Sequence, residues 1–402
     1  MKKISCLFLF FLILFSCKNQ NSEVYILTND VIFFELADIY NSRNKDNKVF
    51  INFYNEKQKN IFSFYKDNKK DYYDIVAGYN GYNNEFETKY FYNLKNYYEN
   101  LTTTDYFNGF NDYIVKNDYY TIPYDIDFPV IIAKKELLSQ TIKETISIQN
   151  FSNLCKNINI TRKEENNYIK KIRFSPYSSN MGEIEYFFIF NDKIQVNNNI
   201  YSFNNEEMSN YFNFLYKFDD NYNFGLEETK KYFDKYKNID KKLYLEKDII
   251  SFDFIQFSNS LTYQKEKFKI LFIENLKHLT LKNKIIAITK NSKYKKQCED
   301  FIRFLVSEEI QKILFEETYS KNYYFENINL PVIKNIISKS QKLDIDVDFL
   351  EKYIDNLSYI DFYNERLRSK FFETYNNSKE SLHKGVLSEK DLLNVLINGI
   401  ND

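Results

Sequence analysis

Three short apolar runs near the start of the chain alternate with segments of helical periodicity. Residues 23–27, 49–54 and 74–78 predict β-strands, because each is a short run of β-branched, aliphatic and aromatic residues. The apolar residues of 31–40 recur at helical spacing, and a charged helix is expected over 56–68. This strand–helix–strand–helix–strand order predicts a parallel sheet covered by helices.

The rest of the chain continues the mixed pattern. Further strands are expected at 128–133, 171–174, 249–254, 268–273 and 284–288, and further helices at about 205–218, 226–237 and 296–314 and from 388 to the end. The apolar strand at 284–288 and the amphipathic helix after it show the same strand-then-helix pattern as the opening segment. The sequence contains no tandem repeat. The expected fold class is therefore α/β, with two lobes interleaved in the sequence.

Length, composition and charge support a globular protein of two domains. The 402 residues exceed what one hydrophobic core usually organises. Hydrophobic residues make up 44% of the chain and charged residues 28%, which is typical of soluble domains. The 55 basic and 56 acidic residues leave a net charge of -1, so the basic excess that nucleic-acid binding normally requires is missing. Because 19% of the residues are aromatic, a single aromatic side chain is weak evidence for a ligand contact.

The first residues predict a secretory signal rather than part of the fold. Two lysines precede an almost unbroken apolar run over 4–15, which is too short to span a bilayer as a mature helix. The run ends at Ser16-Cys17, and a small residue directly before a cysteine resembles the lipobox of bacterial lipoproteins. The resemblance implies that residues 1–16 are a signal peptide, that acyl chains such as palmitate are attached to Cys17, and that 17–22 form a lipidated tether. A plain cleaved signal with an incidental cysteine is the alternative.

Cysteine and histidine residues predict neither a metal site nor a catalytic triad. Cys155 and Cys298 remain after the signal, and an exported location would allow them to pair. Isolated cysteines with apolar neighbours are more often buried thiols. His278 and His383 are far apart and have no neighbouring ligand types, so neither zinc nor any other cofactor is expected.

Five sequence blocks, in the correct order, resemble the sugar-binding type of extracellular solute-binding proteins, which are partners of ABC importers. The blocks are 24–40, Tyr73-Asp74-Ile75-Val76, 119–138, the segment from 285 through Leu330-Pro331-Val332, and 385–393. The resemblance implies a periplasmic-binding-protein-like II fold, in which two lobes joined by a crossover hinge enclose a ligand. It implies lobe 1 at 23–120 plus 283–325, and lobe 2 at 121–282 plus 326–402. The chain departs from the family in having no tryptophan, which the family usually places against sugar rings.

By this resemblance, candidate ligand contacts lie on segments that follow the strands. They are Asp30, Tyr79, Asn80, Tyr82, Asp125, Asp127, Tyr177, Phe254, Phe257, Phe362 and Tyr363. Aromatic faces can cover the apolar faces of sugar rings, while carboxylates accept hydrogen bonds from hydroxyl groups. Each has a structural alternative: a helix cap for Asp30, a simple turn at Asn80-Gly81, a solvated hinge face for Asp125 and Asp127, and a core position for the aromatic residues.

The expected function is that of a substrate-binding lipoprotein of an ABC importer. Such a protein is a monomer that captures a small solute, a sugar or oligosaccharide in the favoured case, at the periplasm or cell exterior and delivers it to the permease subunits. One alternative is a surface or envelope lipoprotein that kept the fold but serves protein–protein interaction. An enzyme with paired acids, such as Glu308 and Glu309 or Asp125 and Asp127, is a further alternative. Acids close together on one segment are usually solvated, so no catalytic residue is expected.

Overall fold

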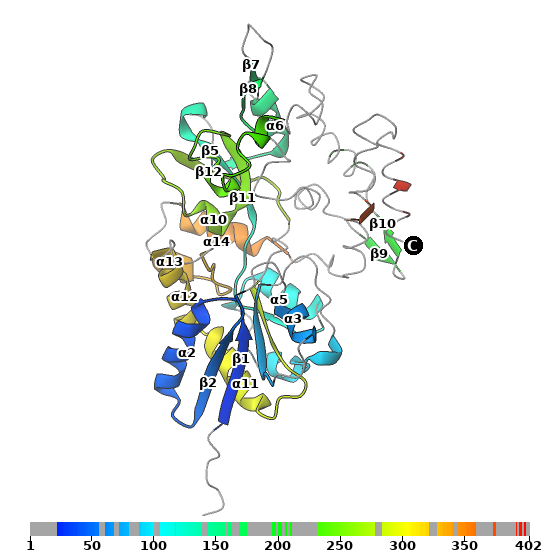
Figure 1. Cartoon of the computed structure of the whole chain (residues 1–402), viewed down its shortest axis with the longest axis vertical. Helices are drawn as coiled ribbons and strands as arrows, with labels where there is room; N and C mark the ends of the chain where they lie inside the picture. The colour runs from blue at the N-terminus through cyan, green and yellow to red at the C-terminus, as the bar shows by residue number, and fades with distance from the viewer. Residues whose placement is uncertain are drawn as a thin grey trace, which may run out of the picture.

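A computed structural model of the chain describes two stretches almost completely, residues 22–174 and 231–358 (Figure 1). The gaps within them are 56–60, 68–71, 80–87, 100, 102–104, 117, 139–143, 157–159, 163–168, 278–283, 321–327 and 341–344. Elsewhere the described residues are 195–197, 200–202, 206, 210, 373–374, 391, 394–395 and 398. None of the described helices is long and apolar enough to cross a membrane.

The first sheet contains the opening strands and one strand from much later in the chain. Its strands are β1 (Ser22–Thr28), β2 (Asn47–Phe53), β3 (Ile75–Tyr79), β4 (Ile122–Pro123) and β13 (Lys284–Ile288), in the spatial order β2-β1-β3-β13-β4. The strands β1, β2 and β3 are parallel, as the opening pattern predicts, whereas β13 runs antiparallel to β3 and β4. The helices near this sheet are α2 (Ile32–Arg43), α3 (Ile61–Asp67), α4 (Lys95–Tyr98), α5 (Asn108–Lys116) and α11 (Lys295–Leu305).

The second sheet lies in the other half of the molecule (Figure 1). Its strands are β5 (Pro129–Lys134), β6 (Thr145–Ile146), β11 (Phe252–Gln256) and β12 (Phe268–Ile273), in the order β11-β5-β12-β6. The helices α6 (Ile148–Lys156) and α10 (Phe257–Ser260) belong to this half, together with a hairpin of β7 (Ile160–Arg162) and β8 (Ile169–Ile172). A further hairpin joins β9 (Gln195–Asn197) to β10 (Ile200–Ser202).

Three helices lie along the region between the two sheets: α12 (Glu308–Ser320), α13 (Ile336–Ser340) and α14 (Val347–Asp355). Short 3₁₀ helices occur at Thr88–Tyr90, Lys135–Leu137 and Lys241–Leu243. The α/β class and the two-lobed architecture predicted from the sequence are therefore confirmed.

The buried apolar residues of both lobes belong to one continuous core cluster. Every residue of β13 and of β5 is buried, which is the pattern of strands covered on both faces. In the first lobe, α11 buries Cys298, Phe301, Ile302 and Leu305 against the sheet, and the ring of Phe301 lies beside Phe33 of α2. The cysteines are not paired with each other, because Cys155 in α6 and Cys298 in α11 are both free and buried.

The single helix predicted over 296–314 is wrong in one respect, because the structure has two helices there, α11 and α12. The first ends at Leu305, and the second begins at Glu308. Ser307 and two glutamates form a helix-start signal, since acidic residues in a first turn interact favourably with the helix dipole. The apolar spacing continues across the break and hides it. The helices predicted at 205–218 and from 388 fall largely outside the described residues, whereas the one predicted at 226–237 is described from 231 and is helical over 231–234.

The chain crosses between the sheets at residues 124–128, which lead from β4 to β5. Ile126 donates a backbone hydrogen bond of 3.4 Å to Leu330, so the segment around Leu330 runs beside this crossover. Both residues of β4 pair with β13, which puts residues 122 and 123 in the first sheet. The crossover therefore begins after Pro123.

Candidate ligand-binding site

The parallel strands of the first sheet end on the side that faces the second sheet (Figure 1). The segment after β1 carries Asn29 and Asp30, and β3 ends with Gly78 and Tyr79. In open α/β sheets, ligands bind beyond the carboxyl ends of the strands, where loops from different strands meet. The junction between the two sheets is therefore the candidate ligand-binding site.

Gly78 allows the end of β3 to lie directly against the segment that follows β1. Its backbone φ is +141°, a conformation that residues with a Cβ atom rarely adopt. A Cβ atom at this position would also collide with the side chain of Asn29. The close approach of these two segments thus depends on glycine.

A buried ion pair joins the segment after β1 to the start of β13. Nζ of Lys284 lies 3.1 Å from Oδ2 of Asp30, and the two side chains are only 3% and 5% exposed. The same oxygen accepts a hydrogen bond of 3.1 Å from the Tyr124 hydroxyl, and Oδ1 accepts one of 3.3 Å from the backbone N–H of Ile32. Lys284 also donates to the side-chain oxygen of Asn329. Both carboxylate oxygens of Asp30 are therefore bonded within the protein in this conformation.

Asp125 is buried beside this ion pair. Its Oδ1 accepts a hydrogen bond of 3.0 Å from the backbone N–H of Leu330. Burial raises the pKa of Asp125 well above its ordinary value; Lys284 opposes this shift, and the negative charges of Asp127 and Asp30 add to it. These surroundings favour the protonated form of Asp125.

Asp127 connects the crossover to α10 through hydrogen bonds. Its Oδ1 accepts hydrogen bonds from the backbone N–H groups of Phe128, at 2.9 Å, and Ser258, at 3.1 Å, and its Oδ2 accepts one from the Ser258 hydroxyl. Burial raises the pKa of Asp127 to about 6, although the hydrogen bonds from Ser258 act in the opposite direction. Phe257 stacks on Phe128 with ring centroids 4.8 Å apart. The crossover and α10 are therefore packed as one unit.

Two of the predicted aromatic contacts, Phe254 and Phe257, are fully buried in the second lobe. Phe254 packs against Phe151 and Phe174, with ring centroids 5.2 and 5.5 Å apart. Phe257 packs against Phe128 and against Phe272 of β12. Neither ring is exposed in this conformation, so each has a core role here, and its contact with a ligand stays a prediction.

A comparison with protein families identifies the family of the chain that contains this junction. Residues 35–321 match the family described as bacterial extracellular solute-binding protein. The chain belongs to this family. Its description implies a location in the periplasm or outside the cell and a role in binding a solute. No curated protein matches the chain.

Solved structures of similar fold cover nearly the whole of this solute-binding protein. A sugar transporter from Rhizobium etli in an open conformation aligns with 94% of this chain and 98% of its own, with a TM-score of 0.69 and 11% identity. The cyclic alpha-maltosyl-1,6-maltose binding protein of Arthrobacter globiformis covers the same shares, with a TM-score of 0.69 and 12% identity. The sugar-binding protein MalE of Xanthomonas citri covers 94% and 96%, with a TM-score of 0.69 and 13% identity. At these identities the likeness establishes the fold.

The structure of this solute-binding protein brings some predicted residues together and leaves others undescribed. Asp30, Asp125 and Asp127 all interact with Lys284. Asp30 forms an ion pair with it, and its positive charge opposes the rise that burial causes in the pKa of Asp125 and Asp127. Tyr79 pairs with Lys284 in the first sheet. The remaining predicted residues, Asn80, Tyr82, Tyr177, Phe362, Tyr363 and the lipidation residue Cys17, lie outside the described residues.

Sequence reasoning does not predict Tyr124, Ser258 or Lys284 as members of this junction. Lys284 offers one signal, because it stands directly before the unbroken apolar strand Ile285–Ile288. A lysine that enters a buried strand requires an acidic partner. The sequence does not say which of the many acids supplies it.

Of the two acid pairs considered for catalysis, Glu308 and Glu309 lie at the surface of α12, whereas Asp125 and Asp127 are buried. Glu308 binds Lys339 at 2.6 Å and Glu309 binds Arg43 at 2.7 Å. All four side chains are strongly exposed, as expected for solvated surface charges. Among the residues that the structure describes, no group of His, Cys, Asp and Glu is arranged to hold a metal ion.

Proposed function

We propose that this solute-binding protein is the substrate-binding component of an ABC importer and that it binds a sugar or oligosaccharide between its two lobes. The observation that carries the proposal is the junction itself, where the carboxyl ends of three parallel strands meet a crossover that carries two buried aspartates. The fold neighbours include a Listeria monocytogenes substrate-binding protein in complex with cycloalternan, and a Streptomyces glaucescens receptor in complex with acarbose. They support a carbohydrate as the solute.

The proposed mechanism is a ligand-driven shift between an open and a closed form. A solute that contacts both lobes has a higher affinity for the closed form, and it shifts the equilibrium by that difference in affinity. In the proposed division, lobe 1 comprises 23–120 with 283–325 and lobe 2 comprises 121–282 with 326–402. The buried network at Lys284 holds the connection between the lobes in one arrangement, because its charged groups are costly to separate.

The proposed solute contacts are the loop residues at the junction. Asn80 and Tyr82 follow β3, and Tyr177 follows the strand that ends near Phe174. Phe362 and Tyr363 complete the proposed aromatic contacts. Because the chain has no tryptophan, tyrosine and phenylalanine rings supply the stacking surface for sugar rings.

We also propose that Cys17 is acylated and anchors the protein to a membrane as a monomer. Signal peptide, small residue and cysteine occur in the order that lipidation requires. Metabolic labelling with a radioactive fatty acid tests this proposal: wild-type protein incorporates the label, and Cys17→Ser does not. Equal labelling of the two proteins would contradict it.

A thermal-shift screen tests the proposed ligand class. The panel contains monosaccharides, maltose- and mannose-based oligosaccharides, polyamines, amino acids and phosphate, each at millimolar concentration. A ligand at about 100 times its dissociation constant stabilises the folded protein by about 2.7 kcal/mol, so a true solute raises the melting temperature visibly. We expect a shift with at least one carbohydrate. A shift with a non-carbohydrate alone would contradict the ligand class, and no shift with any compound would contradict solute binding.

A further inference from the structure

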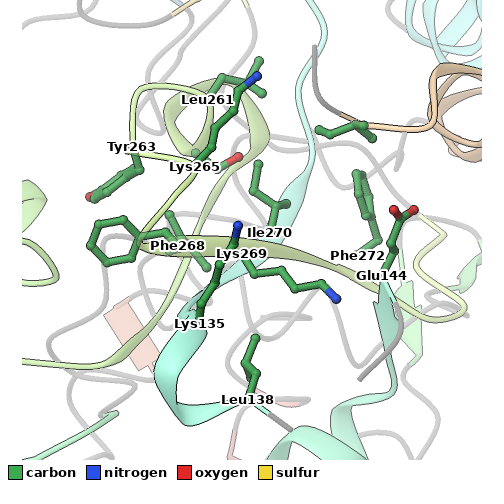
Figure 2. A pocket seen from close by; sticks show the side chains of 13 residues that line it. Lys135, Leu138, Glu144, Leu261, Tyr263, Lys265, Phe268, Lys269, Ile270 and Phe272 are labelled. Carbon is green, nitrogen blue, oxygen red and sulfur yellow. The ribbon is translucent and has the colours of Figure 1, made fainter. Parts of the chain in front are cut away.

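A pocket of about 430 Å³ lies on the second lobe (Figure 2). Its walls come from β5, β12, the connection between α10 and β12, the segment after β5 and the approach to α14. None of the junction residues around Lys284 lines it. The pocket is therefore separate from the proposed solute site.

The floor of this pocket is apolar. Ile132 of β5 and Ile270 of β12 are direct partners in the second sheet, and Phe268 and Phe272 point to the same face as Ile270 because side chains alternate along a strand. Leu138, Leu261 and Ile345 add apolar walls. Ile270 is only half-buried, so its side chain is available to an occupant.

The rim of the pocket carries an excess of positive charge. Lys135, Lys265 and Lys269 line it, against one acid, Glu144 (Figure 2). Lys135 and Lys265 are exposed, and lysine side chains at such a rim can cover apolar surface with their stems while the charged ends stay in water. Tyr263 also lines the pocket (Figure 2).

We propose that this pocket binds an organic anion with a hydrocarbon body, of the class of medium-chain carboxylates. The apolar floor removes the hydrocarbon from water, and the lysines attract the anionic group. The volume is within the range of small-molecule pockets, and a few polar groups beside an apolar floor are what such pockets present. A neutral sugar lacks the charge that the positive rim attracts, so the charge pattern favours the anion.

Isothermal titration calorimetry with sodium decanoate, below its micelle concentration and in detergent-free buffer, tests the proposal. We expect saturable binding of one decanoate per protein and clearly weaker binding of decanol, which has the same chain without the charge. The double variant K135E/K265E reverses two rim charges, and we expect it to weaken decanoate binding about tenfold or more, equivalent to about 1.4 kcal/mol. K267E is the matched control, because Lys267 is exposed on the same connection but does not line the pocket.

A second variant tests the floor independently of the rim. Ile270→Trp fills the pocket with a larger apolar side chain, and we expect it to abolish decanoate binding while carbohydrate binding at the junction persists. Equal affinity for decanoate and decanol would overturn the proposal, as would no decanoate binding, or an equal effect of K267E and the double variant. Because the rim variants alter only exposed side chains, they remain informative even if the tryptophan variant does not fold.

Discussion

Asp127 shows how burial and hydrogen bonding act on one residue in opposite directions. The carboxyl group is almost completely buried, yet it accepts three hydrogen bonds, two of them from Ser258. The penalty of burial exceeds the benefit of these bonds, so the pKa lies at about 6 instead of 3.8. Because this pKa is higher in the folded protein than in the unfolded chain, the free energy of unfolding depends on pH.

The pH dependence of stability tests this view of Asp127. Between about pH 4 and pH 6 the folded protein keeps a proton that the unfolded chain releases, so the stabilisation is complete at low pH and is lost as pH rises through 6. Asp127→Asn keeps the shape but cannot titrate. We expect the free energy of unfolding of the wild type, relative to that of this variant, to fall by about 2–3 kcal/mol between pH 4 and 7. Urea titrations at stepped pH measure it, and a difference that stays constant with pH would contradict the account.

The structural role of Gly78 depends on its backbone conformation and on the absence of a side chain. Gly78→Ala forces a Cβ atom into a conformation that disfavours it and against Asn29, so we expect a loss of about 1–3 kcal/mol in the free energy of unfolding. Adding Asn29→Ala relieves the collision but not the backbone strain, and most of the loss should persist. Urea unfolding of both variants measures this. A single variant as stable as the wild type would show that β3 tolerates a Cβ atom here.

At the scale of the elements, apolar runs predict strands well and breaks between helices poorly. The strands at 268–273 and 284–288 have the predicted bounds, because each is an apolar run with polar ends. The first three strands are within two residues of their predicted bounds for the same reason. The break between α11 and α12 is missed because the spacing of apolar residues does not show where one helix ends and the next begins, near Ser307.

The helix α14 depends on its cap to pack on the second lobe. Asp346 accepts a hydrogen bond of 3.1 Å from the backbone N–H of Phe349, and Phe349 and Tyr353 pack against Phe272 at ring distances of 5.1 and 5.2 Å. We expect Asp346→Ala to lower the free energy of unfolding by about 1 kcal/mol. Lys352→Ala, in the last turn of the same helix, is the control and should change it by less than about 0.5 kcal/mol. Chemical denaturation compares them, and equal effects would contradict the capping role.

At the scale of the whole molecule, the junction shows what sequence reasoning leaves open. The aspartates are predicted because they follow strands, and strand ends are visible in the sequence. Their partner Lys284 is not, because it reaches Asp30 only after β13 inserts between β3 and β4. The order of strands in a sheet depends on tertiary packing, which a single sequence does not reveal.

Removing Lys284 tests whether the buried network stabilises the junction. Lys284→Met leaves the Asp30 carboxylate buried without its cation, and breaking a buried ion pair on one side costs about 3–5 kcal/mol. We expect a loss of that size in urea unfolding and a partial recovery in the double variant D30N/K284M, where neither charge remains. Lys290→Met is the control, because Lys290 is exposed just beyond β13. A double variant no more stable than the single one would argue against the ion pair.

The distance between the lobes, with and without a solute, tests the central claim most directly. Spin labels on cysteines introduced at Asp38 and Lys267, both exposed and on different lobes, report this distance in a C6S/C17S background. The native Cys155 and Cys298 are buried thiols with raised pKa values, so the labels react with the introduced sites. With the carbohydrate that gives the largest thermal shift, we predict that the distance shortens at saturation. An unchanged distance in the saturated protein would contradict a mechanism in which the two lobes close on a solute.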